Sequence, residues 1–213
     1  MTELEQKIQK YGIIPVVVLN KVQDAIPLGK ALLAGGLPVA EVTFRTSAAE
    51  DSIKILCKEY PDLLIGAGTV LTIEQVNRAV NAGAEFIVTP GFNSKVVQYC
   101  IKEKIPVIPG CSTPSDIEKA LELGIHTVKF FPAEQAGGLP MIRSLSGPYT
   151  DVYYVPTGGI NMGNIKDYLK NEKILACGGT WMVKNDLIQS ERFDQIQALT
   201  KEAVDAVKDV RGE

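Results

Sequence analysis

The sequence predicts an α/β fold, a single-domain (β/α)8 (TIM) barrel over residues 1–213 with an extra N-terminal helix. Eight short apolar segments of strand length recur along the chain, amphipathic segments of helical periodicity separate them, and no composition shift marks a linker. This length lies at the compact end of the range of about 200 to 400 residues for such barrels. The competing architecture is an open doubly wound sheet, which commonly has fewer strands. Its G-x-G-x-x-G spacing is missing from the glycine-rich segment after the third strand.

Each expected strand is a run of apolar residues. The eight runs begin at Ile13, Val39, Leu63, Phe86, Pro106, Thr127, Tyr153 and Ile174. Between them, apolar residues recur at helical spacing, for example after Ala25 and after Ala48. Thr72 and Thr113 are expected N-caps of two of these helices. Glycine is expected to end three helices, at Gly35, Gly83 and Gly124.

Two helices are expected outside this repeating pattern. The segment Leu4–Tyr11 is amphipathic, and we expect it to cover the N-terminal end of the barrel. The segment Phe193–Val210 carries a stripe of apolar residues, which predicts a last helix that packs on the core.

Composition and charge exclude several classes of partner. The net charge is −3 and the pI is near 5.4, which argues against a partner bound by charge, either nucleic acid or an anionic membrane. No apolar run approaches the roughly 20 residues of a membrane helix. The first residues carry charges where a signal peptide would be apolar. We therefore expect a soluble cytoplasmic protein that binds neither nucleic acid nor membrane.

The metal-binding residue types are sparse. The four cysteines form no CxxC pair, so buried free thiols in a reducing compartment are the simplest interpretation. Catalytic zinc sites usually use two or three histidines, and this chain has only His126. A zinc mechanism is therefore not expected, while magnesium held by carboxylates stays open. His126 precedes its strand, at the end of the barrel opposite the expected active site, and a structural role is expected.

The second strand places charged residues at the mouth of the barrel. Side chains alternate between the two faces of a strand, so Glu41, Thr43 and Arg45 share one face. Val42 and Phe44 share the other, which should pack on the helices outside. Glu41 and Arg45 are then expected to point into the mouth. A solvent-exposed ion pair is the alternative, but a closed barrel has no exposed edge strand to carry it.

Lys129 stands among apolar residues in the sixth strand. Its ammonium group would be costly to bury unless it were paired or neutral. It could extend from the strand end to water, as many lysines do. Alternatively, a desolvated amine near Arg45 would favour its neutral form and could attack a ketone to form a Schiff base. Glu41 would then move protons, and Arg45 would suit a substrate carboxylate.

Glycine pairs follow the last two strands. PTGGI contains Gly158 and Gly159, and GGTW contains Gly179 and Thr180. The loops after strands seven and eight often bind phosphate in this fold, through backbone N–H groups. The glycines could also serve only as tight turns. The positions of both pairs favour phosphate binding, with the Thr180 hydroxyl as a further donor.

Six motifs in this order and spacing resemble a known family over nearly the whole chain. They are EVTFRT from Glu41, GAGTV from Gly66, VTPG from Val88, KFFPAE from Lys129, PTGGI from Pro156 and GGTW from Gly178. The family is 2-keto-3-deoxy-6-phosphogluconate (KDPG) aldolase, bifunctional with 2-keto-4-hydroxyglutarate (KHG) aldolase. Taken together the motifs are specific, and KFFPAE is the strongest.

The resemblance implies a class I lyase that uses no metal or other cofactor and assembles as a homotrimer. Its expected substrates are small 2-keto acids, which it would cleave to pyruvate and an aldehyde phosphate. By position in the motifs, Lys129 matches the Schiff-base lysine and Glu41 the acid/base carboxylate. The other matches are Arg45, Thr69, Pro90 and Phe131 around the pyruvate end, and Gly158, Gly159, Gly179 and Thr180 around the phosphate.

Several functions stay open on the sequence alone. Many relatives have serine where this chain has Thr180, and the extra methyl could alter the preference between phosphorylated and unphosphorylated substrates. An aldolase specific for the galactonate epimer or for an unphosphorylated acid would share the lysine. A barrel that binds a sugar phosphate without catalysis is the alternative from another class.

Overall fold

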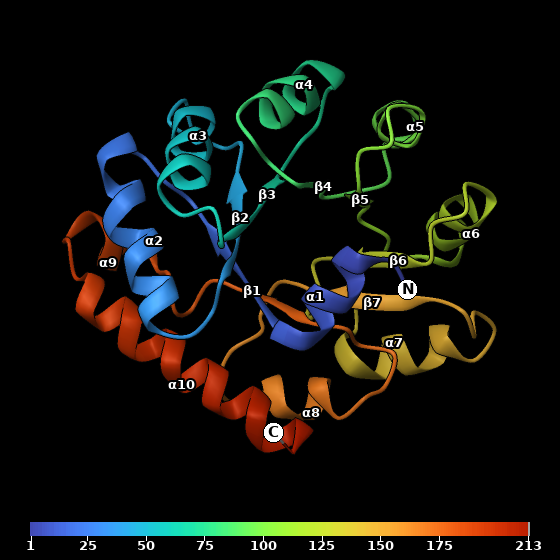
Figure 1. Ribbon diagram of the computed structural model, residues 1–213. Helices are drawn as coiled ribbons and strands as arrows, with labels where there is room; N and C mark the ends of the chain where they lie inside the picture. The colour runs from blue at the N-terminus through green and yellow to red at the C-terminus, as the bar shows by residue number, and fades with distance from the viewer. Residues whose placement is uncertain (213) are drawn as a thin grey trace.

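The computed structural model describes residues 1–212, in which parallel strands alternate with helices around a central barrel (Figure 1). The eight strands are β1 (Ile13–Val17), β2 (Val39–Thr43), β3 (Leu64–Gly68), β4 (Phe86–Val88), β5 (Val107–Ile108), β6 (Thr127–Phe130), β7 (Tyr153–Pro156) and β8 (Cys177–Gly179). All eight lie in the segments that the sequence predicted as strands.

Helices surround the strands (Figure 1). They are α1 (Glu3–Tyr11), the 3-10 turn η1 (Val22–Asp24), α2 (Ala25–Ala34), α3 (Ala49–Glu59), α4 (Ile73–Asn81), α5 (Ser94–Lys102), α6 (Pro114–Glu122), α7 (Gly138–Ser146), α8 (Ile165–Leu169), α9 (Asn185–Gln189) and α10 (Phe193–Arg211). Both predicted N-caps are confirmed. The Thr72 hydroxyl accepts from Gln75 N, and Thr113 forms a capping box with Asp116.

Backbone pairing closes the strands into a barrel. Six strands form a parallel ladder in the order β5-β4-β3-β2-β1-β8, and β6 pairs with β7. Bridges from Gly110 to Lys129 and from Thr157 to Gly178 join these two sheets at both edges. The predicted (β/α)8 barrel is therefore confirmed, and the open doubly wound alternative is wrong.

Two strands are shorter than the apolar runs suggested. Strand β5 has only Val107 and Ile108, because Pro106 and Pro109 flank it and proline has no backbone N–H for a ladder. The last run begins at Ile174, but that residue makes only an isolated bridge to Tyr154, and β8 begins at Cys177.

Helix α1 lies across one end of the barrel, at the centre of the view in Figure 1. Ile8 is fully buried there, and the Thr127 hydroxyl at the start of β6 donates to Glu5 Oε1 at 2.6 Å. His126 is beside it, with Nδ1 3.2 Å from the Asp151 carbonyl oxygen. As predicted, α1 covers the N-terminal ends of the strands, so the C-terminal ends form the opposite mouth.

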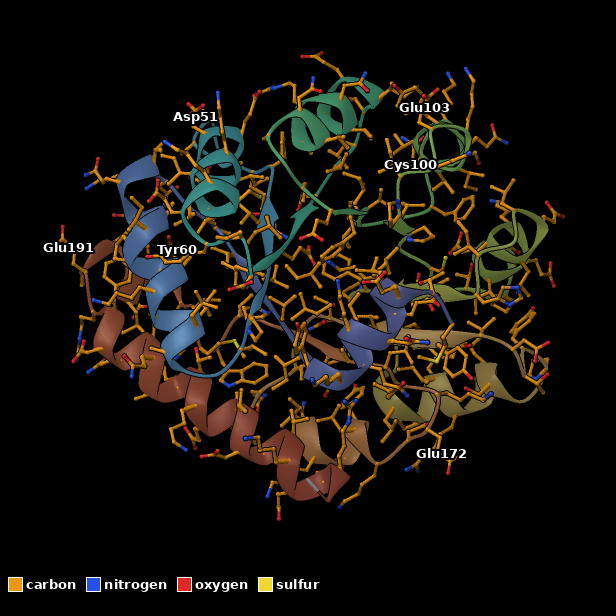
Figure 2. All side chains as sticks on the ribbon, viewed as in Figure 1. Asp51, Tyr60, Cys100, Glu103, Glu172 and Glu191 are labelled. Atoms are coloured by element: carbon orange, nitrogen blue, oxygen red, sulfur yellow. The ribbon has the colours of Figure 1, made fainter. Side chains whose placement is uncertain are left out.

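Apolar side chains fill the space between strands and helices (Figure 2). Among the largest fully buried side chains are Tyr154 and Phe130. The apolar stripe of α10 packs on this core through Ile196, Ala203 and Val207, which confirms its predicted orientation. That residues 1–213 form one domain stays a prediction.

Candidate active site

Lys129 in β6 and Glu41 in β2 form an ion pair inside the barrel. Lys129 Nζ lies 3.0 Å from Glu41 Oε1 and 3.3 Å from Oε2. Only 4% of Lys129 and 3% of Glu41 is exposed. Two charges buried this deeply are costly to remove from water, and each compensates the other. Strand parity therefore placed Glu41 correctly, and its carboxylate is the group that contacts the Lys129 amine.

Glycines in β3 make room for this pair. Glu41 pairs in register with Gly66, and Thr43 with Gly68. A Cβ at Gly68 would lie 2.1 Å from Glu41 Oε1, and one at Gly66 would lie 2.3 Å from the Phe86 ring. A side chain at Gly68 would therefore displace the Glu41 carboxylate, and one at Gly66 would displace the Phe86 ring. No pattern in the sequence indicates the role of Gly68, because glycine in GAGTV also suits a turn.

Phe131 forms an apolar wall beside the amine. The ring centre of Phe131 lies 5.4 Å from Lys129 Nζ, within the range of a cation–π contact. The next peptide bond, Phe131–Pro132, is cis. Phe131 therefore lies beside the Lys129 amine, and its role at the pyruvate end of the site stays a prediction.

Arg45 lies at the rim of the mouth. The parity argument placed it inside, but β2 ends at Thr43 and the chain then turns, so Arg45 is exposed. Phe44 still faces outward, with the Arg78 guanidinium 5.8 Å from its ring centre. Arg45 Nε donates to Thr69 Oγ1 at 3.0 Å, which joins two of the residues predicted for the carboxylate end.

Thr69 and Pro90 lie in neighbouring loops of the same mouth. Thr69 has φ of +54°, a left-handed conformation that is uncommon for a residue other than glycine and is concentrated at functional sites. The backbone of Pro90 packs closely on Gly110, since a Cβ there would lie 2.3 Å from the Pro90 carbonyl. Gly110 in turn bridges Lys129. Pro90 therefore lies near the backbone of Lys129, with Gly110 between them.

The glycine pair after β7 lies next to Gly178 and Gly179, which were expected after the last strand but form the end of β8. Gly158 and Gly159 have φ of +104° and +81°, which favours glycine at both positions. Thr157 bridges Gly178, so the two loops run side by side. Thr180 follows them and is exposed. Glycines in this conformation can turn successive N–H groups toward an anion.

The described residues supply no metal cluster. Nowhere in residues 1–212 do three or more His, Cys, Asp or Glu side chains gather in a way that could hold an ion. All four cysteines are free thiols, and all but Cys57 are buried. Burial raises the pKa of the Cys111 thiol to about 12.

The chain matches the KDPG and KHG aldolase family over residues 4–199. It belongs to this family. The 2-dehydro-3-deoxy-phosphogluconate aldolase of Haemophilus influenzae is 48% identical over 206 residues, which covers 97% of each chain. The resemblance inferred from the motifs is confirmed, and with it the prediction that the chain is a lyase of the aldolase class.

Two solved structures of relatives bear on the site. KDPG aldolase from Legionella pneumophila, with pyruvate captured at low pH as a covalent carbinolamine intermediate, superposes with a TM-score of 0.91. It is 39% identical and covers 94% of this chain and 98% of its own. The 2-keto-3-deoxy-6-phosphogluconate aldolase of Zymomonas mobilis ZM4 with 3-phosphoglycerate has a TM-score of 0.88. It is 38% identical and covers 95% of each chain.

None of the helices among the described residues has the length and apolar character required to cross a membrane.

Proposed function

We propose that this chain is a class I aldolase that cleaves KDPG to pyruvate and glyceraldehyde 3-phosphate, and KHG to pyruvate and glyoxylate. The observation that carries the proposal is the buried pair of Lys129 and Glu41, 3.0 Å apart at the mouth of the barrel. A primary amine beside a carboxylate is what Schiff-base chemistry requires. The pyruvate carbinolamine of the Legionella relative supports the same chemistry.

Lys129 is the proposed nucleophile. Glu41 lies close enough to take a proton from its ammonium group, directly or through a water. The free amine then attacks the C2 ketone of the substrate to form a carbinolamine. Glu41 returns its proton to the carbinolamine hydroxyl, which leaves as water and gives a protonated imine. Phe131 excludes water from one side of this nitrogen.

Glu41 is the proposed acid and base of the cleavage step. It accepts the proton of the C4 hydroxyl, the aldehyde forms at C4, and the C3–C4 bond breaks. The electron pair of that bond moves to the imine nitrogen and leaves an enamine. Protonation of C3 and addition of water then release pyruvate and restore the Lys129 amine. A positioned carboxylate of this kind contributes roughly 10² to 10⁴ in rate.

The remaining predicted site residues are proposed to hold the two ends of the substrate. Arg45, fixed by Thr69, offers a guanidinium fork to the C1 carboxylate, and Pro90 lies beside it. Backbone N–H groups at Gly158, Gly159 and Gly179, with the Thr180 hydroxyl, receive the phosphate. Binding of 3-phosphoglycerate by the Zymomonas relative supports a site for a phosphorylated acid.

Borohydride trapping tests the proposal. Pyruvate and borohydride together should give a covalent adduct on the peptide that contains Lys129, found by mass spectrometry. Lys129→Met should give no adduct and no aldol cleavage. An adduct on another lysine, or none with the unmodified chain, would contradict the class I assignment. A barrel that only binds a sugar phosphate would keep ligand affinity in Lys129→Met and never form the adduct.

Substrate preference is tested by comparing kcat/KM for KDPG, its galactonate epimer and KHG. Our proposal expects the highest value for KDPG, and equal values without the phosphate would contradict it. A homotrimer in the cytoplasm is also proposed. The trimer rests on the family resemblance, and the four free thiols support a reducing compartment.

A further inference from the structure

Glu134 ends the KFFPAE motif and lies next to the glycine turn that follows β7. Two backbone hydrogen bonds join the loop after β6 to this turn. Ala133 N donates to the Thr157 carbonyl at 2.8 Å, and Glu134 N donates to the Gly158 carbonyl at 3.1 Å. The loop that follows Lys129 and the turn proposed to bind phosphate are therefore one connected unit.

The aliphatic part of Glu134 packs against Gly159. A Cβ at Gly159 would lie 2.5 Å from Glu134 Cγ and 2.7 Å from its Cβ, whereas the carboxyl carbon is 3.9 Å away. The methylene groups of Glu134 thus pack against the turn, and its carboxylate lies farther from Gly159 than they do. Any movement of this side chain would change the position of the turn.

A tyrosine holds the Glu134 carboxylate in this orientation. The Tyr168 hydroxyl, from α8, donates a hydrogen bond to Glu134 Oε1. Tyr168 is 2% exposed, and burial together with the Glu134 contact raises the pKa of its phenol, which keeps the donor protonated. Gly138, with φ of +57°, leaves room for the pair, because a Cβ there would meet Glu134 Oε1 at 3.0 Å.

Amide groups hold the same turn from another side. Asn161 Nδ2 and Asn164 Nδ2 each donate to the Gly159 carbonyl at 3.1 Å. The carbonyls of Gly158 and Gly159 are thus both used by the protein. The bridge between Thr157 and Gly178 directs the Gly158 N–H toward the Gly178 carbonyl. Within residues 1–212, the Gly159 N–H donates to no protein atom, so it is the donor of this turn that remains for an anion.

We propose that Glu134 and Tyr168 are positioning residues for the phosphate end of the substrate. This inference rests on the proposed function and deepens it. The tyrosine fixes Glu134, which supports the turn of Gly158 and Gly159 and keeps its own negative charge away from the phosphate. A released carboxylate could rotate toward the turn, where like charges repel. Phosphate binding would weaken, while Schiff-base chemistry at Lys129 would continue.

The test compares phosphorylated and unphosphorylated substrates in Tyr168→Phe and Glu134→Ala. In both variants KM for KDPG should rise about tenfold, roughly the effect of one lost charge-assisted hydrogen bond. The ratio of kcat/KM for KDPG to that for KHG should fall by the same factor. Glu134→Gln should stay near the wild-type ratio, since its amide oxygen still accepts from Tyr168.

A second tyrosine–glutamate pair provides the matched control. The Tyr149 hydroxyl donates to Glu118 Oε1 at 2.9 Å, at the N-terminal end of the barrel. Tyr149→Phe should leave the substrate ratio unchanged. Equal losses for both substrates in Tyr168→Phe and Glu134→Ala would indicate a general effect on folding and overturn the proposal. An unchanged ratio in both would overturn it as well.

The affinity for inorganic phosphate tests the positioning role of Glu134 and Tyr168 independently of aldolase activity. This affinity, measured by calorimetry, should fall about tenfold in Tyr168→Phe, whether or not the chain cleaves KDPG. The pyruvate adduct on Lys129 should form in Tyr168→Phe as in the wild type. No adduct in either protein contradicts the aldolase mechanism, whereas unchanged phosphate affinity contradicts the positioning role.

Discussion

Lys129 Nζ and Glu41 Oε1 lie 3.0 Å apart, although 88 positions separate the two residues in the chain. Adjacent strands of the barrel do not join them directly, since they come from β6 and β2. The two side chains meet across the interior, where neither has access to bulk water. A buried ion pair of this kind contributes little more to folding stability than apolar residues of similar size would. Its presence therefore favours a role in catalysis.

Substitution of Glu41 separates its chemical role from its structural role. Glu41→Gln keeps the size of the side chain and an oxygen that accepts from Lys129, but it cannot take a proton. We expect kcat for KDPG cleavage to fall by about 10² to 10⁴. The unfolding midpoint should fall less than in Glu41→Ala, because the amide oxygen still accepts from Lys129 although the compensating charge is lost. Glu41→Ala leaves a buried ammonium group unpaired and should lower the free energy of unfolding by about 3 to 5 kcal/mol. Normal turnover in Glu41→Gln would refute the proton-transfer role.

Gly68 should be essential for activity although it carries no functional group. In Gly68→Ala the new methyl would lie 2.1 Å from Glu41 Oε1, so the carboxylate must move. A displacement of about 1 Å can cost roughly 10² in rate, and we expect kcat to fall by about that factor. Gly147→Ala is the control, since its nearest contact would be an ordinary 3.4 Å from the Ser144 carbonyl. If Gly68→Ala were as active as Gly147→Ala, catalysis would not depend on the exact position of the Glu41 carboxylate.

Thr180 should contribute through its hydroxyl group. Thr180→Ala removes a donor to the phosphate, so KM for KDPG should rise about fivefold, the effect of one ordinary hydrogen bond. Thr180→Ser keeps the hydroxyl and should stay close to the wild type, which isolates the effect of the methyl. Steady-state kinetics with KHG serve as the reference, because this substrate has no phosphate. Loss of activity on KHG in Thr180→Ala would contradict a role limited to phosphate binding.

Chelation should leave the activity unchanged. In the proposed mechanism the protonated imine at Lys129 withdraws the electrons that a divalent metal would otherwise withdraw. Dialysis against EDTA is therefore expected to preserve kcat for KDPG. A loss that magnesium or another divalent cation restores would contradict the class I mechanism.

The sequence predicted the residues whose position follows from strand parity. Lys129 and Glu41 lie within β6 and β2, where alternation holds, and both were placed correctly. Arg45 was expected to point into the mouth, but it lies two residues beyond the end of β2, in a turn where strand alternation no longer fixes the direction of a side chain, and it is exposed.

Other parts of the site depend on contacts that no local pattern encodes. The space that Gly68 leaves for Glu41 arises from the register between β2 and β3. Glu134 and Tyr168 meet through the packing of the loop after β6 against α8. Both glutamate and tyrosine are common on surfaces, so their types alone do not indicate that they pair.

A last prediction concerns the pH dependence of stability through Cys111. Burial, with a smaller effect of Asp116, raises the pKa of this thiol from 9.0 to about 12. The folded chain therefore favours the protonated thiol, and the unfolded chain loses its proton first as pH rises. The stability that Cys111 contributes is fully present below pH 9 and is lost as pH rises toward 12.

The measurement is the difference in the free energy of unfolding between the wild type and Cys111→Ala. We expect this difference to shrink by roughly 1 kcal/mol per pH unit above about pH 9. Val97→Ala is the matched control, because Val97 is fully buried and does not titrate, so its difference should stay constant. Lysines and tyrosines that titrate in the same pH range are present in both the wild type and the variant, so their effect on the free energy of unfolding cancels in the difference. A Cys111→Ala difference that also stays constant would mean that the buried thiol keeps an ordinary pKa.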